Sequence, residues 1–149
     1  MNYHLAQVNV ALPLFPRGDA RIAGFFDNIE AINAIADASP GFIWRSMDEE
    51  TEAEAERVFA EPGLVFNLSL WESPQALRDF VYHSDHLQFL RKRAQWFRPR
   101  GGPAFALWWI AAGKQPTVTE ARHRLDRLQH VGPSEDAFTF NSIFLPPGG

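Results

Sequence analysis

One stretch, residues 64–97, constrains the fold more than any other part of the chain. Its first eight residues alternate in character with a period of two, which is the pattern of a β-strand. One face is purely apolar and is expected to lie under helices; it carries Leu64, Phe66, Leu68 and Leu70. The other face mixes an amide, a hydroxyl and an indole, which suits a pocket or a partly wet interface; it carries Val65, Asn67, Ser69 and Trp71.

A helical pattern follows this strand. Ser73 stands where an N-cap belongs, and Pro74 occupies the first helical position. The sequence His83-Ser84-Asp85-His86 interrupts the pattern, and a second helical face continues from Leu87 to Phe97. Pro and Gly residues at 99–102 end it. The stretch therefore predicts one strand and two helical segments in succession.

The rest of the chain predicts three more strands and two more helices. The strands are Tyr3–Leu12, Phe42–Met47 and the strongly apolar Ala104–Ala111, which we expect to be buried on both faces. The helices are residues 22–36, capped by Asp19, and Val118–Val131, capped by Thr117 or Thr119. An aromatic tail, Phe138–Phe144, must be buried on this subunit or on a neighbour.

The segment Asp48–Glu56 holds six carboxylates. We expect a solvated loop or a short exposed helix there rather than a metal or partner site. Its spacing does not match a calcium-binding loop. The segment would then connect the second and third predicted strands.

The order of the predicted elements is β-α-β-β-α-β, followed by a helix and an extended tail. It predicts an α+β class with a ferredoxin-like arrangement and right-handed crossovers. We expect one domain over residues 1–149, with the ferredoxin-like core in residues 1–112 and the C-terminal helix and tail in residues 113–149. Because two helices cover only one face of such a sheet, a second copy is expected to cover the other, which predicts a symmetric homodimer.

Composition excludes several classes of function. A net charge of −4 argues against nucleic acid as a partner, because phosphate binding needs a basic surface. The absence of Cys removes thiol nucleophiles, iron–sulfur clusters and thiolate zinc sites, and it fits a cytoplasmic location. No signal peptide and no membrane span are expected. Hydrolase, kinase and Rossmann motifs are missing from the sequence.

The segment NLSLWESPQALRDFVYHSDH resembles the strand–helix signature of the dimeric α/β-barrel superfamily. That superfamily includes antibiotic-biosynthesis monooxygenases and related haem-degrading enzymes. The segments YHLAQVNVA, SPGFIWR, WESPQALRDFVY and LWWIAAGKQPTVTEARHRL are similar to a bacterial family of unknown function within it, and the likeness covers nearly the whole chain. The resemblance implies the fold and the homodimer, but not one chemistry.

The resemblance to cofactor-independent oxygenases implies a site that holds a phenolic substrate and stabilises its anion. The positions that match the motif are Asn67, which can hydrogen-bond a substrate oxygen, and Trp71, which can wall the pocket. Gln7 and Asn9 are further amide candidates, although these amides can equally satisfy one another across a dimer interface. Large rings line apolar pockets, and the candidates to contact substrate are Trp44, Tyr82 and Trp108.

The haem-degrading relatives imply a helical His as an axial ligand, and His83 and His86 fall on the corresponding segment. The alternative is that both are solvated or capping residues. Their i, i+3 spacing lacks a third ligand nearby, so no metal site is expected. The cofactor is therefore expected to be none or haem. A basic cluster after them is either a solvated face or a site for a carboxylate; it comprises Arg91, Lys92, Arg93, Arg98 and Arg100.

These observations lead to three hypotheses. The first is a monooxygenase-like dimeric enzyme that acts on a small apolar or aromatic metabolite. The second is a haem-binding protein on the same scaffold. The third is a non-catalytic ligand-binding or stress-associated dimer.

Overall fold

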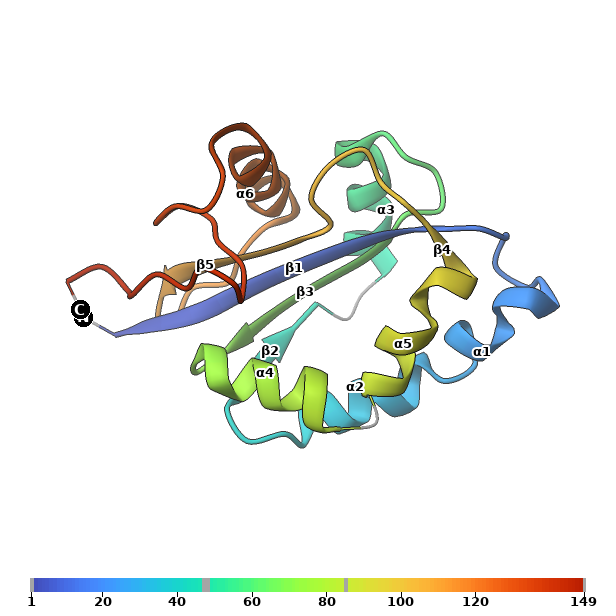
Figure 1. Cartoon of the computed structure of the whole chain (residues 1–149), viewed down its shortest axis with the longest axis horizontal. Helices are drawn as coiled ribbons and strands as arrows, with labels where there is room; N and C mark the ends of the chain where they lie inside the picture. Colours follow the sequence, from blue (N-terminus) through green and yellow to red (C-terminus); the bar gives the residue numbers. More distant parts are fainter. Residues whose placement is uncertain (1, 47–48, 85, 149) are drawn as a thin grey trace.

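The computed structural model describes residues 2–46, 49–84 and 86–148. An antiparallel sheet runs through the middle of the molecule, and helices lie on both of its faces (Figure 1). The strands are β1 (Tyr3–Pro13), β2 (Phe42–Arg45), β3 (Val65–Trp71), β4 (Phe97–Arg98) and β5 (Phe105–Ala111). The mixed α+β class predicted from the sequence is confirmed.

Strand β1 is central, because it pairs with β3 on one side and with β5 on the other. The sheet order is β2-β3-β1-β5, and the short β4 pairs with the end of β1 at Leu12 and Pro13. Every paired neighbour is antiparallel. The register sets Gln7 opposite Ser69 and Asn9 opposite Asn67. Polar residues that are 60 positions apart in the sequence therefore meet on one face of the sheet.

The helices of the first half are η1 (Ala20–Ile22), α1 (Ala23–Phe26), α2 (Ile29–Asp37) and α3 (Glu49–Phe59). The single helix predicted over residues 22–36 is wrong, because the chain breaks between α1 and α2 at Asp27 and Asn28. The Asn28 side chain donates a hydrogen bond to the carbonyl of Gly24 (3.0 Å). Asn and Asp side chains compete in this way with the regular helical ladder.

Of the two forms expected for the acidic segment, the structure has the helix, α3. Its side chains Ala55 and Phe59, one helical turn apart, are buried against the sheet. Three glutamates stand in its first turn, where the helix dipole favours negative charge. Met47 and Asp48, which the sequence assigned to the preceding strand and to this segment, lie outside the described residues.

The second half supplies α4 (Pro74–His83), α5 (His86–Trp96) and α6 (Val118–Val131). Ser73 caps α4 and Thr117 caps α6 through their side-chain oxygens, as the sequence predicted. None of the helices in the described part of the chain combines the length and apolar composition needed to cross a lipid bilayer.

One face of the sheet is dry. The apolar side chains of β3, together with Val8 and Trp108, pack under α3 and α6, which Figure 1 places on the same side. The apolar face of β3 was expected to lie under helices, and α3 and α6 are the helices that cover it. The premise that the other face lacks helices is wrong, because α4 packs there.

The opposite face carries α4 at one end, together with the C-terminal tail. Leu5, Trp71 and Leu107 are fully or almost fully buried there, as is Phe138 of the tail. Phe138 forms a bridge with Leu107 through two backbone hydrogen bonds (2.8 and 2.9 Å). The predicted burial of the aromatic tail is confirmed on this subunit for Phe138, whereas Phe140 and Phe144 are half-buried.

Removing residues 139–149 should lower the free energy of unfolding. Phe140 packs on Phe105, and the Phe144 carbonyl accepts a hydrogen bond from the Trp109 indole (2.8 Å). Loss of two half-buried rings costs about 2 kcal/mol, which for a chain of this size lowers the melting temperature by roughly 4–8 °C. Removing only residues 145–148 and Gly149 is the matched control, because Leu145 is 71% exposed. Equal melting curves for both truncations would contradict this account of the tail.

Candidate functional site

A buried hydrogen-bonded group lies across β1 and β3, and we call it the polar strip: Gln7, Asn67, Ser69 and the indole of Trp71. Gln7 Nε2 donates to Asn67 Oδ1 (2.6 Å) and to Ser69 Oγ (3.0 Å). Trp71 Nε1 donates to the same Ser69 Oγ (2.9 Å). Gln7 and Ser69 are only 4% and 5% exposed. The donors Gln7 Nε2 and Trp71 Nε1 therefore find their acceptors within the strip, as buried donors require.

The strip orients the amide of Asn67. Because Asn67 Oδ1 accepts from Gln7, the Nδ2 end of the same amide is the one left to donate. Within the described residues, neither Asn67 Nδ2 nor the Asn9 side chain has a hydrogen-bond partner, and both residues are half-buried. Asn9 stands directly opposite Asn67 in the register. The sheet thus presents amide groups that are available to a ligand.

Of the two alternatives for these amides, the structure shows that Gln7 and Asn67 satisfy each other, but within one chain. Gln7 holds the side chains of Asn67 and Ser69 in place, and Asn67 Nδ2 is the donor that has no partner among the described residues. The sequence pattern placed Ser69 on this face without assigning it a role. Its role depends on a cross-strand partner 62 positions away, which local periodicity does not reveal.

An aromatic wall adjoins the strip. The Trp71 ring is 1% exposed and stacks on Phe80 of α4, with centroids 5.4 Å apart. Phe42 of β2 meets Trp71 edge-on at 5.3 Å. Phe80 in turn contacts the His86 ring at 4.9 Å. The stacked rings of Trp71 and Phe80 therefore link the polar strip to His86 at the start of α5.

His86 is neutral near pH 7. Burial lowers the pKa of its imidazole below the ordinary value, and the hydrogen bond with the Val81 carbonyl opposes this only partly. His86 Nδ1 lies 3.4 Å from that carbonyl oxygen. The contact favours the tautomer that carries the proton on Nδ1, which leaves Nε2 as an acceptor.

Helix α4 packs on the face that carries Asn67 and Trp71, not on the apolar face of β3. Asn67, Trp71 and His86 are therefore on the same side of the sheet. His83 is exposed at the end of α4, away from this group. Tyr82 is 40% exposed and contacts Phe140 of the tail instead.

Trp44 and Trp108, two of the predicted substrate contacts, pack with the core under α3 and α6, on the opposite face. The sequence placed Trp44 on the same face as Phe42, and this is wrong. A register shift between Phe42 and Trp44 sets Phe42 opposite Trp71 but Trp44 opposite Leu70. The extra residue of such a bulge reverses the facing of the residues after it. Neither tryptophan reaches the polar strip.

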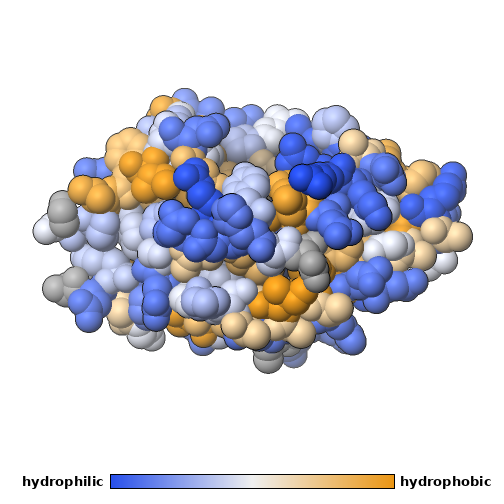
Figure 2. Space-filling view, turned by 60° about the horizontal axis from the view of Figure 1, so that its bottom comes forward, coloured by the Kyte–Doolittle hydropathy of each residue, from blue (hydrophilic) through white to orange (hydrophobic). Residues whose placement is uncertain are grey.

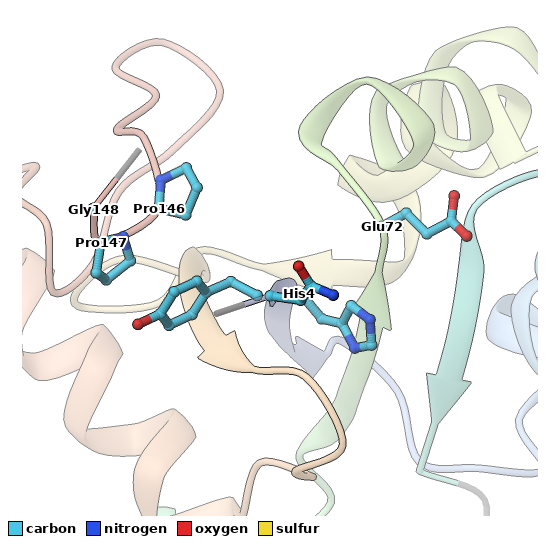
Figure 3. A pocket seen from close by; sticks show the side chains of 7 residues that line it. His4, Glu72, Pro146, Pro147 and Gly148 are labelled. Atoms are coloured by element: carbon cyan, nitrogen blue, oxygen red, sulfur yellow. The ribbon is translucent and has the colours of Figure 1, made fainter.

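Two of the grooves on the described surface are large enough for a small ligand, and neither of these two is lined by the polar strip. The first, of about 420 Å³, lies between the start of β1, Glu72 and Pro146–Gly148 of the tail (Figure 3). The second, of about 360 Å³, lies between α1, α2 and α5. Over the described ranges, no group of three or more His, Asp or Glu side chains is placed to hold a metal ion.

Ser69→Ala should destabilise the fold more than its small volume change suggests. The variant leaves the buried Trp71 indole N–H without its acceptor and removes one partner of Gln7. An orphaned buried donor costs about 1–3 kcal/mol, to be measured by urea unfolding. Ser142→Ala is the control, because Ser142 is exposed and its hydroxyl has no partner in the described residues. Equal free energies of unfolding for the two variants would mean that the buried Trp71 N–H does not need Ser69 as its acceptor.

Stability should also fall as the solution is acidified through the range of the His86 pKa. Because folding lowers this pKa, His86 binds a proton more readily in the unfolded chain. The free energy that neutral His86 contributes to stability is therefore complete above the ordinary pKa of about 6.5 and is lost as the pH falls below it. Thermal melts between about pH 7.5 and 5.0 should show this loss, and His86→Gln should flatten it. His123→Gln, on the exposed side of α6, should leave the pH profile unchanged.

The comparisons with known proteins identify a family and a related fold. Residues 4–149 match the model of the family described as "Domain of unknown function (DUF3291)". No curated protein matches the chain. The crystal structure of NE2512, a protein of unknown function from Nitrosomonas europaea, is similar at a TM-score of 0.50 with 11% identity, over 77% of this chain and 96% of that one. PA3566 from Pseudomonas aeruginosa aligns at a TM-score of 0.47 with 13% identity, over 74% and 94% of the two chains.

Proposed function

The chain belongs to the DUF3291 family, and from the geometry of its polar strip we propose that it is a monooxygenase-like enzyme acting on a small apolar or aromatic metabolite. One observation carries the proposal. An asparagine amide, Asn67, is fixed by Gln7 with its N–H end free, on a sheet face whose neighbouring wall is aromatic. Such a donor suits a substrate oxygen that gains negative charge during the reaction.

The proposed roles depend on the chemical group that each residue offers. Asn67 Nδ2 donates to the phenolic oxygen and stabilises the anion, and Asn9 opposite it is a second amide at the same level of the sheet. Trp71, held by Ser69 and Phe80, keeps the adjoining surface rigid and apolar. His86 Nε2, in its neutral form, is an acceptor for a proton on the same side of the sheet.

The scaffold is part of the same proposal. The strand order β2-β3-β1-β5, with antiparallel neighbours, supports a ferredoxin-like arrangement of the β-α-β-β-α-β elements. We propose membership of the dimeric α/β-barrel superfamily, with a homodimer in the cytoplasm. Since α3 and α6 already cover the dry face, the second subunit would approach an edge of the sheet or the face that carries Asn67.

Haem is the alternative cofactor, and the residues present do not fit it. His83 is exposed at the end of α4. His86 has its ring against Phe80 and its Nδ1 at the Val81 carbonyl, and neither described groove includes it. A flat macrocycle beside His86 would have to displace Phe80 from Trp71. The proposal therefore routes no step through haem.

The test is oxygen consumption across a panel of phenols and quinols, recorded with an oxygen electrode. The native protein should consume oxygen with at least one of them, and Asn67→Ala should lower the rate by about 10²-fold, the typical effect of removing an oxyanion donor. Asn141→Ala, in the exposed tail, should keep the native rate. Binding without any oxygen uptake would replace this proposal with the third hypothesis, a non-catalytic ligand-binding protein.

A further inference from the structure

The groove between α1, α2 and α5 has the composition of a small-molecule site. Its lining combines the apolar side chains of Ile32, Ile35, Phe89 and Trp96 with the polar side chains of Asn28, Gln88 and Lys92. Its volume of about 360 Å³ falls at the lower end of the range of roughly 300–1,000 Å³ that is usual for small ligands. Figure 2, which brings forward the side with α2, α4 and α5, shows patches of apolar surface between polar residues.

Trp96 is held rigidly in this groove. It is only 5% exposed and packs against the rings of Phe25 and Phe89 at 5.8 and 5.5 Å. Gly24 lets the indole approach α1, because a Cβ there would lie 3.1 Å from Trp96 Cζ2. The position of the indole N–H is thereby fixed without a ligand.

Two donors of the groove have no partner among the described residues. The Trp96 Nε1–H has no acceptor there, and this atom keeps some contact with solvent although most of the side chain is buried. Lys92, one helical turn before Trp96, has no carboxylate within ion-pair distance among the described residues. Both groups donate, so an occupant that accepts can pair with both of them.

We propose that this groove binds a small amphipathic carboxylate. The carboxylate oxygens accept from Trp96 Nε1–H and pair with the Lys92 ammonium, while a short apolar tail lies on Ile32, Ile35 and Phe89. A neutral hydroxyl head could accept from the indole N–H but would form no ion pair with Lys92, and a cationic head would face the ammonium directly. None of these residues belongs to the polar strip, so the site is independent of the function proposed for Asn67.

The experiment is a titration of ¹⁵N-labelled protein with decanoate, followed by NMR through the indole N–H signals of its five tryptophans. Trp96→Phe identifies the Trp96 signal by its loss. Decanoate should shift this signal saturably, with little change at the Trp108 indole, which is fully buried under α6. Decanol and decylammonium have the same tail and should bind at least about fivefold more weakly, since they lack the ion pair.

Variants on the exposed rim keep the test independent of folding. Lys92→Gln should weaken decanoate binding about fivefold, and Ala31→Trp should block it by filling the groove from the surface. Arg93→Gln is the matched control, because Arg93 is the next cation on α5 but does not line the groove. The proposal is overturned if the Trp96 signal does not saturate, if decanol binds as tightly as decanoate, or if Arg93→Gln weakens binding as much as Lys92→Gln.

Discussion

Burial of the Gln7 amide is the constraint on which the rest of the sheet depends. An amide removed from water must find partners or cost about 1–3 kcal/mol. Gln7 finds them in Asn67 and Ser69, and only in the register that sets Gln7 opposite Ser69. A slip of one residue would turn Gln7 toward the dry face beside Val8. The polar strip and the apolar layer behind it therefore select the same pairing of β1 with β3.

This register gives the sheet two unlike faces. The dry face under α3 and α6 is a layer of aliphatic and aromatic side chains. The other face carries the strip, the aromatic wall and amide groups without protein partners among the described residues. Because Gln7 holds the oxygen of the Asn67 amide, the Nδ2 donor of Asn67 has a fixed direction without a ligand. Such preorganisation is what a site for a developing negative charge needs.

Helices on both faces also change what a second subunit can do. The acidic α3 and the Arg-rich α6 lie side by side, and Arg122 of α6 donates to the Val58 carbonyl of α3. Their burial of Phe59 and Leu125 closes the dry face within one chain. A second subunit would therefore pack at an edge of the sheet or on the face with Asn67, and it would not be needed to bury the dry face.

The sequence by itself determined the elements whose periodicity is local: the alternating strand β3, the caps Ser73 and Thr117, and an aromatic tail that needs burial. It also placed Asn67 and Trp71 on one face. Tertiary structure decided that Gln7 joins them through hydrogen bonds to Asn67 and Ser69, that the bulge in β2 turns Trp44 away, and that α4 covers the Asn67 face. These features depend on pairing between residues about 30 to 60 positions apart, and the period of a single segment carries no information about its partner.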